Sequence, residues 1–249
     1  MQRKISRLLR EEEIMYDNGA EGDNLLSSAS QHCVLRGEKW PDKPIRLYSM
    51  TYSGHGHRVE LFLSLLGLPY EKINVDPKSG FLKQIEYRRL NPHSLVPVLV
   101  DGDVTLHEST AILVYLARTY GNNWLPDDPV REALVQQWFS YCSGPIAHGP
   151  CAARRLVVYD EELVPFVTAI DIATKFFLVA EEHFSNHAYA IGDVLTVADI
   201  AAYTYIAHAP EGGISLEPYP NLTDWLGRIE DLPGFVRMPR APEPSLEEA

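Results

Sequence analysis

The feature that most constrains the fold is a change in the spacing of apolar residues about midway along the chain. Between residues 45 and 122, strand-length apolar runs alternate with stretches in which apolar residues recur three and four apart. From residue 130 to residue 240, every segment has helical spacing and none resembles the earlier strand candidates. The sequence therefore predicts an α/β domain over 45–122, an all-helical domain over 130–240, and a linker between them.

The α/β region is expected to follow the order β-α-β-α-β-β-α. Gly67 ends the first helix, because glycine suits the left-handed conformation found after a helix C-terminus. The DGD turn at 101–103 reverses the chain between the last two strands. The expected strands are 45–50, 70–75, 97–100 and 104–106, and the expected helices are centred on 59–66, 81–90 and 108–121.

Three features organise the helical region. An apolar stripe from Leu163 to Phe184 predicts one long core helix. The run GPIAHGP at 144–150 predicts a bend, because proline removes a backbone donor and glycine loosens the chain. Thr196 and Asp199 have the spacing of a capping box, so we interpret Asp199 as structural and leave it out of the site.

Composition excludes several classes of function. The net charge of -12 and the pI near 5.2 disfavour nucleic acid and anionic membranes as partners, since both bind surplus Lys and Arg. The three cysteines have no C-x-x-C spacing, which predicts no disulfide framework and fits a reducing cytoplasm. Neither a membrane span nor a signal core is apparent. We expect residues 1–44 to be a disordered arm and 241–249 a tail.

Four short strings, each weak alone, resemble together the soluble, bacterial-type, serine-dependent members of the glutathione S-transferase family. The resemblance covers about residues 45–238 and implies a thioredoxin-like domain followed by a helical bundle. It implies a cytoplasmic homodimer that activates its co-substrate glutathione and conjugates it to a hydrophobic electrophile, as in detoxification. The strings are LYSMTYSGHGHRVEL at 47–61, NPHSLVPVLVDGD at 91–103, HESTAILVYL at 107–116 and IGDVLTVADI at 191–200.

Ser53 is the catalytic residue that the resemblance implies, since SGHGHRV matches the family pattern S-G-x-x-x-[RK]-V. The thiol of glutathione has a pKa near the roughly 8.5 of free cysteine, so it is mostly protonated at neutral pH. A hydroxyl that donates to the sulfur at the positive end of a helix favours the thiolate. Tyr52 and Thr51 are rivals for this role, Tyr52 the stronger, and Ser53 could also be an N-cap.

The resemblance also places the tripeptide. Val96 would bind its cysteinyl part through the backbone, before a cis bond to Pro97. Glu108 and Ser109, at the start of a helix, would read the γ-glutamyl ammonium and carboxylate, although an ordinary cap explains these two residues alone. The glycine carboxylate is assigned to the loop and the helix before Pro97, which offer His93, Ser94 and Lys83.

The electrophile is expected between the domains, against Tyr52, Trp138 and Tyr141, although the last two also have core spacing. His55 and His57 form an H-x-H that we interpret as solvent-exposed loop histidines, so no metal is expected. Two other functions stay open. One is a binding or scaffold protein without turnover. The other is glutathione-dependent disulfide or dehydroascorbate reduction, which in this family commonly uses cysteine where the chain has Ser53.

Overall fold

A four-stranded mixed sheet forms the first half of the protein in the computed structural model, which describes residues 39–121 and 123–241. The strand order is β2-β1-β3-β4. The first two strands are parallel, and the other neighbouring pairs are antiparallel. The strands are β1 (Ile45–Ser49), β2 (Tyr70–Asn74), β3 (Val98–Asp101) and β4 (Val104–His107).

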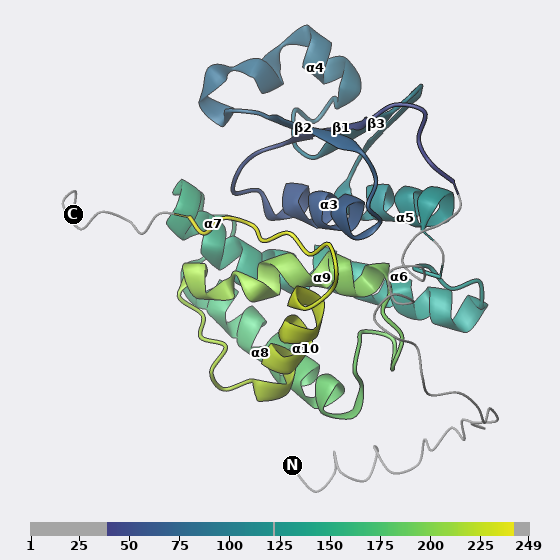
Figure 1. Ribbon diagram of the computed structural model, residues 1–249. Helices are drawn as coiled ribbons and strands as arrows, with labels where there is room; N and C mark the ends of the chain where they lie inside the picture. The colour runs from purple at the N-terminus through teal and green to yellow at the C-terminus, as the bar shows by residue number, and fades with distance from the viewer. Residues whose placement is uncertain (1–38, 122, 242–249) are drawn as a thin grey trace, which may run out of the picture.

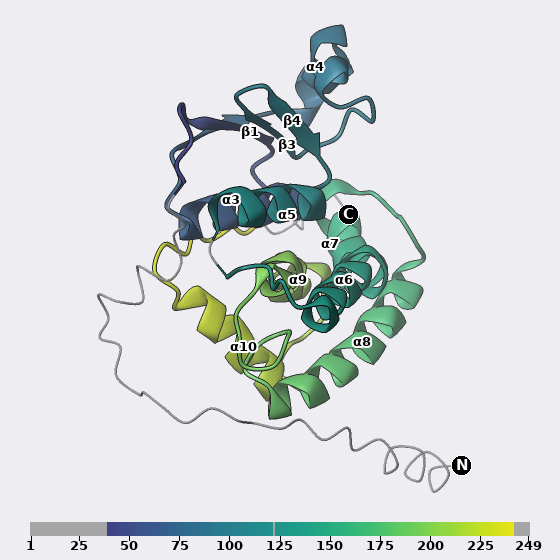
Figure 2. The ribbon, with the colours of Figure 1, turned by 90° about the vertical axis from the view of Figure 1, so that its right-hand side faces the viewer.

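Helices cover both faces of this sheet. The helices α3 (Gly54–Leu65) and α5 (Ser109–Tyr120) lie side by side on one face, and α4 (Ile85–Leu90) lies on the other (Figures 1 and 2). This arrangement confirms the predicted order β-α-β-α-β-β-α. The segment predicted as one helix over 81–90 divides into a 3-10 turn, η2 (Phe81–Lys83), and α4, because Gln84 between them is extended.

The remaining described chain is helical. The helix α9 (Val197–Ala207) is buried along almost its whole length, which fits its mostly apolar sequence, and its neighbours surround it (Figure 2). These elements are α6 (Pro129–Ser143), a π-helical turn η3 (Ala147–Cys151), α7 (Ala152–Tyr159), α8 (Phe166–Asn186), α9 (Val197–Ala207), a 3-10 turn η4 (Ala209–Gly212) and α10 (Pro220–Glu230). Among the described residues, no helix has both the length and the apolar character to cross a bilayer.

The helical predictions are largely confirmed. The predicted bend occurs where α6 stops at Gly144 and η3 follows, and the stripe to Phe184 lies on α8. Leu163 is the exception: it precedes the helix and is 49% exposed, because Pro165 caps the start of α8. The Thr196–Asp199 capping box is present.

Asp199 is structural, as predicted. Its carboxylate is fully buried and accepts hydrogen bonds from the backbone of Thr196 at 2.9 Å and Ala190 at 2.7 Å, and from Trp225 Nε1 at 3.0 Å. These three donors tie the start of α9 to α10 and to the preceding loop.

The helix α3, which belongs to the α/β half, packs against the linker, α9 and the chain after α10. Trp124, in the predicted linker, is buried with its ring 5.0 Å from that of Phe62. His57 contacts Thr204 Oγ1 on α9 at 2.9 Å and the carbonyl of Val236 at 2.8 Å. The chain after α10 therefore returns to the α/β half and fixes the helix whose N-terminus forms the site.

This buried histidine predicts sensitivity to acid. Burial lowers the pKa of His57 from 6.5 to about 4, so the folded state binds its proton less readily than the unfolded state. The stabilisation is complete above pH 6.5 and is lost as the pH falls through 4. Between pH 7 and 4, wild type should lose roughly 3 kcal/mol more stability than His57→Gln. Urea unfolding at a series of pH values measures this difference, with the exposed His148→Gln as control; parallel profiles for wild type and His57→Gln would refute the assignment.

Candidate active site

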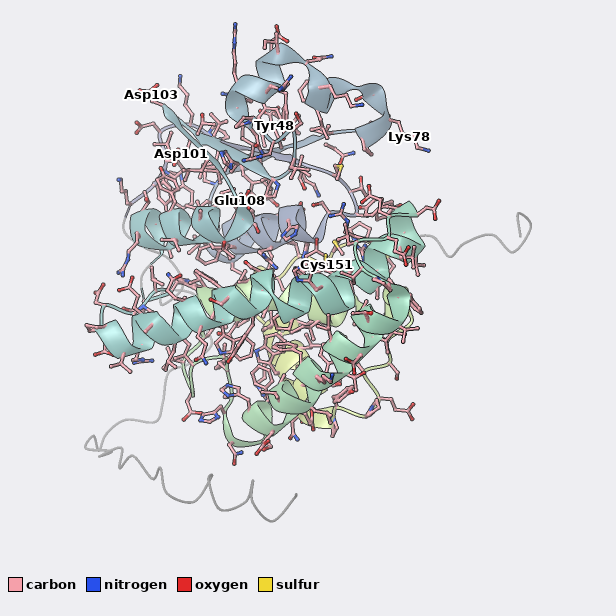
Figure 3. The ribbon with its side chains drawn as sticks, turned by 180° about the vertical axis from the view of Figure 1, so that it is seen from behind. Tyr48, Lys78, Asp101, Asp103, Glu108 and Cys151 are labelled. Atoms are coloured by element: carbon pink, nitrogen blue, oxygen red, sulfur yellow. The ribbon has the colours of Figure 1, made fainter. Side chains whose placement is uncertain are left out.

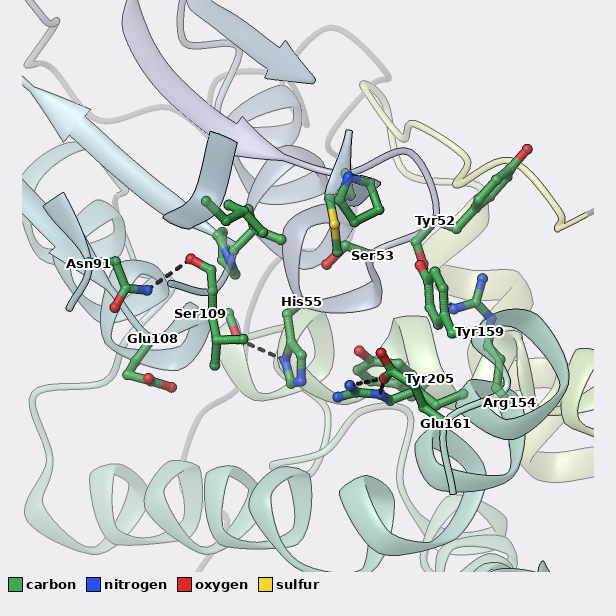
Figure 4. A pocket seen from close by; sticks show the side chains of 17 residues that line it. Tyr52, Ser53, His55, Asn91, Glu108, Ser109, Arg154, Tyr159, Glu161 and Tyr205 are labelled. Carbon is green, nitrogen blue, oxygen red and sulfur yellow. Dashed lines mark hydrogen bonds and ion pairs between the residues drawn. The ribbon is translucent and has the colours of Figure 1, made fainter. Parts of the chain in front are cut away.

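A cavity of about 230 Å³ lies where the loops of the α/β half meet α7 and α9 (Figure 4). The β1–α3 loop, the turn before β3 and the β4–α5 junction line one side. The helices α7 and α9 line the other. Seventeen residues border it, and they include Tyr52, Ser53, Val96, Pro97, Glu108 and Ser109 of the predicted site.

Ser53 is the N-cap of α3 and borders this cavity. Its Oγ accepts a hydrogen bond from Gly56 N at 3.1 Å, and the residue is 8% exposed. A hydroxyl that accepts through a lone pair keeps its own proton for donation. Capping and donation to a ligand are therefore compatible, and both occur at the positive end of a helix.

Two glycines let this helix start approach its neighbours. A Cβ on Gly56 would lie 1.9 Å from Ser49 Oγ, and one on Gly54 would lie 2.6 Å from the ring of Tyr205 on α9. Larger residues would push the N-terminus of α3 away from the strand and from the helical half. The SGHG string thus has a packing reason beyond its chemistry.

The rivals of Ser53 are less well placed. Thr51 Oγ1 donates to Asn74 Oδ1 at 3.1 Å, and Thr51 does not border the cavity. Tyr52 borders the cavity, but its ring points away from Ser53 (Figure 4). Its carbonyl accepts a hydrogen bond from Arg154 Nη1 at 2.9 Å, which holds the loop that carries Ser53.

The turn before β3 is the second part of the predicted site. The Val96–Pro97 bond is cis, as predicted, and both residues line the cavity. Tyr87 Oη and Asn91 Nδ2 both donate to the carbonyl of Leu95, at 2.8 and 2.9 Å. These two hydrogen bonds hold the backbone of the turn that carries Val96 and Pro97.

The β4–α5 junction brings Glu108 and Ser109 to the cavity. Glu108 has φ 69°, a left-handed value uncommon for glutamate, and a side chain that is 70% exposed. It lies where the sheet layer meets α5 (Figure 3). Glu108, not Ser109, is the cap residue of α5, and it makes no side-chain capping bond. The ordinary-cap interpretation of Ser109 is therefore wrong.

Ser109 is instead backed by Arg58, which sequence analysis did not single out. Arg58 is 1% exposed and its Nη1 donates to Ser109 Oγ at 3.0 Å. Its carbon Cζ lies 5.8 Å from the ring centroid of Tyr205. Its Nε and Nη2 have no hydrogen-bond partner in the described part of the chain. The only sequence signal for Arg58 was its place in the SGHGHRV string. That string does not indicate its partner Ser109, which lies 51 positions away.

The two histidines of the H-x-H were interpreted wrongly. Both lie in α3, where His57 is buried and His55 is half-buried beside Ser109, with 3.3 Å between Nδ1 and Oγ. Burial, Arg58 and Arg155 together lower the pKa of His55 to about 3, so it is neutral. Within residues 39–121 and 123–241, no three His, Cys, Asp or Glu side chains gather as a metal site would require.

Besides Thr51, five predicted residues do not line the cavity. Lys83 and His93 are exposed, Ser94 is half-buried, and the ring of His93 faces His107 with centroids 5.9 Å apart. Trp138 and Tyr141 lie against α8 and border a separate cavity there. The helical spacing of α6 turns its aromatic stripe toward α8 rather than toward the site, which corrects their assignment to the electrophile pocket.

On the helical side, the cavity is lined mainly by α7 and the residues just after it, not by the aromatic residues of α6. We call this lining the α7 wall; its members are Arg154, Arg155, Tyr159 and Glu161. Arg154 is 1% exposed, and its Nε donates to Glu211 Oε2 at 2.8 Å. Arg155 pairs with Glu161. The sequence did not point to this wall, because the aromatic residues expected in the pocket were those of α6, whereas α7 contributes one tyrosine among charged and aliphatic residues.

The fold and the site define a two-domain protein in which a thioredoxin-like domain presents a serine at a helix N-terminus beside a helical bundle. Residues 47–124 match the model of the glutathione S-transferase N-terminal domain, and residues 168–233 match that of the C-terminal domain. The chain belongs to the glutathione S-transferase family.

Individual relatives agree with this assignment. The chain is 33% identical to glutathione S-transferase Z1 of Arabidopsis thaliana over 78% of its own length and 90% of the relative. It is similar to the crystal structure of a glutathione S-transferase from Pseudomonas fluorescens, with TM-score 0.73, 32% identity, and coverage of 79% of this chain and 99% of that one. A homologue from Drosophila mojavensis, solved with bound glutathione, has TM-score 0.67, 31% identity, and coverage of 76% and 89%.

Proposed function

We propose that this glutathione transferase holds the thiol of glutathione as a thiolate beside Ser53 and delivers it to an electrophilic small molecule. The observation that carries the proposal is the Ser53 hydroxyl. It caps α3, borders the cavity and keeps a proton to donate to the sulfur. The donor and the helix terminus both stabilise negative charge at the sulfur.

The rest of the tripeptide is proposed to lie along the α/β half. The γ-glutamyl carboxylate binds Ser109 and the free backbone donors of α5, with the Arg58 charge behind. Glu108 pairs with the ammonium group, and Val96 binds the cysteinyl part through its backbone. Lys83, His93 and Ser94 do not line the cavity but are close in sequence to residues that do, and they remain the candidates for the glycine carboxylate.

The thiol proton is proposed to leave for solvent rather than for a base in the cavity. His55 lines the cavity, but a pKa of about 3 makes it a poor acceptor at neutral pH. The thiolate then forms the sulfur–carbon bond, and a leaving group such as halide departs with the electron pair of the bond that breaks. The chain contributes electrostatic stabilisation rather than proton transfer.

A cytoplasmic homodimer is the expected form, following the family. The serine at position 53 disfavours the reductase alternative, which commonly uses cysteine there. The charge of -12 disfavours nucleic acid and anionic membranes as partners. The scaffold alternative differs from the enzyme only in turnover, so a direct assay separates the two.

The test is to titrate the thiolate absorbance of glutathione bound to the protein and to assay conjugation of 1-chloro-2,4-dinitrobenzene. The bound thiol should ionise with a pKa at least one unit below the roughly 8.5 of a free thiol, and conjugate should form. S-methylglutathione, which has no thiol, is the control and should bind without the absorbance change. Binding with an unshifted thiol and no conjugate would support the scaffold instead.

A further inference from the structure

The α7 wall carries two buried polar atoms with unused hydrogen-bonding capacity. Arg154 Nη2 and Tyr159 Oη are both inaccessible to solvent, and neither has a hydrogen-bond partner among the residues that the structure describes. Both side chains line the cavity. A buried donor left without an acceptor destabilises the folded state, so two such donors in one wall point to a ligand group that completes them.

Two of the three nitrogens of the Arg154 guanidinium are already bound, so only Nη2 is available to a ligand. Its Nε donates to Glu211 Oε2 at 2.8 Å, and its Nη1 donates to the carbonyl of Tyr52 at 2.9 Å. Gly212 lets η4 pack directly on α7, since a Cβ there would lie 2.6 Å from Arg154 N. The guanidinium is therefore preorganised by contacts with both halves of the protein, and a ligand would not have to order it.

Tyr159 lies close to this guanidinium. Burial raises the pKa of Tyr159, while the charge of Arg154 and a side-chain hydrogen-bonding interaction with its guanidinium lower it, so the hydroxyl oxygen faces the arginine and its proton stays free to donate. Figure 4 shows their side chains together on the side of Ser53 that faces away from Ser109 and Glu108. The γ-glutamyl end of glutathione is assigned to the opposite side, which leaves the α7 wall to the second substrate.

We propose that the electrophilic substrate carries a carboxylate, which Arg154 Nη2 and Tyr159 Oη bind while the thiolate at Ser53 attacks the electrophilic carbon. The inference rests on the proposed function and names the substrate class of that same site. A carboxylate has two acceptor oxygens and no donor, so it can complete both groups at once. The aromatic pocket expected from the sequence is replaced by a charged and phenolic one.

The experiment compares two glutathione conjugates that differ in one group, S-(4-carboxybenzyl)glutathione and S-(4-carbamoylbenzyl)glutathione, by calorimetry. Wild type should bind the carboxylate about tenfold more tightly than the amide, the ratio expected for a charged hydrogen bond. Tyr159→Phe removes only a hydroxyl without a partner among the described residues, so it should fold normally and lose most of this preference. S-hexylglutathione should bind equally to wild type and variant.

One control variant and one further test variant complete the experiment. Tyr70→Phe removes a hydroxyl from a half-buried tyrosine on β2 that does not line the cavity, and it should keep the full preference. Arg154→Lys keeps the charge but loses the planar fork, and it should also reduce the preference for the carboxylate.

Each other outcome overturns the inference in a distinguishable way. Equal affinity of wild type for the carboxylate and the amide, with S-hexylglutathione bound, removes the carboxylate subsite and leaves the proposed function intact. An equal loss of affinity for all three conjugates in Tyr159→Phe would mean that the α7 wall holds a carboxylate of glutathione itself. Failure of all three conjugates to bind wild type would overturn the proposed function and this inference together.

Discussion

Replacing Ser53 with alanine is expected to raise the pKa of bound glutathione toward that of the free thiol and to lower kcat/KM about 10- to 100-fold. The range corresponds to the roughly 1.5–3 kcal/mol of a hydrogen bond donated to a charged group. The loss should appear mainly in kcat at pH 6.5 and shrink as the pH rises, because glutathione then ionises without help. Thiolate absorbance and a pH series of conjugation rates measure both effects.

The same change removes an N-cap, so a control for stability is needed. Loss of a serine cap typically costs about 1 kcal/mol. Asp128 caps α6 and accepts from Arg131 N at 2.8 Å, and it does not border the cavity. Asp128→Ala should therefore lower stability by a similar amount and leave thiol ionisation and turnover unchanged. Unaltered ionisation in Ser53→Ala would remove Ser53 from its role and return Tyr52 to consideration.

Local signals in the sequence were enough to predict most of the fold. Strand and helix periods differ, so the order of elements along the chain followed from the spacing of apolar residues together with turn signals such as Gly67 and the DGD turn. The capping box of Thr196 and Asp199 acts over three residues, and it is present in the structure as predicted. The cis bond at Val96–Pro97 and the approach of Ser53, Glu108 and Ser109 to one cavity followed from the family resemblance.

The features that sequence analysis missed depend on contacts between distant segments. His57 is buried against α9, where it contacts Thr204. The two residues are 147 positions apart in the sequence, and no local pattern predicts such a contact. The spacing of Trp138 and Tyr141 defined one face of α6 but not which neighbour that face would meet. Arg154 was missed for the same reason, since its partners are the carbonyl of Tyr52 and the carboxylate of Glu211.

Arg58 is the clearest case of a residue whose effects on stability and on binding should have opposite signs. It is a buried cation that forms no ion pair with a carboxylate of the described residues, and such a charge destabilises a fold unless it is paired. Arg58→Met fills a similar volume without charge. We expect it to raise the free energy of unfolding without ligand by about 1 kcal/mol or more. Chemical denaturation without glutathione measures this gain.

The same variant should weaken glutathione binding about 10- to 100-fold, since the γ-glutamyl carboxylate loses the charge behind Ser109. Ser109→Ala should weaken binding comparably without the gain in stability, and Arg58→Lys should fall between Arg58→Met and wild type. Calorimetry with glutathione, read beside the unfolding curves, compares the four proteins. A loss of stability in Arg58→Met with unchanged affinity would show that Arg58 supports the fold alone. The opposite pattern would show that the protein keeps an unfavourable buried charge because its ligand is an anion.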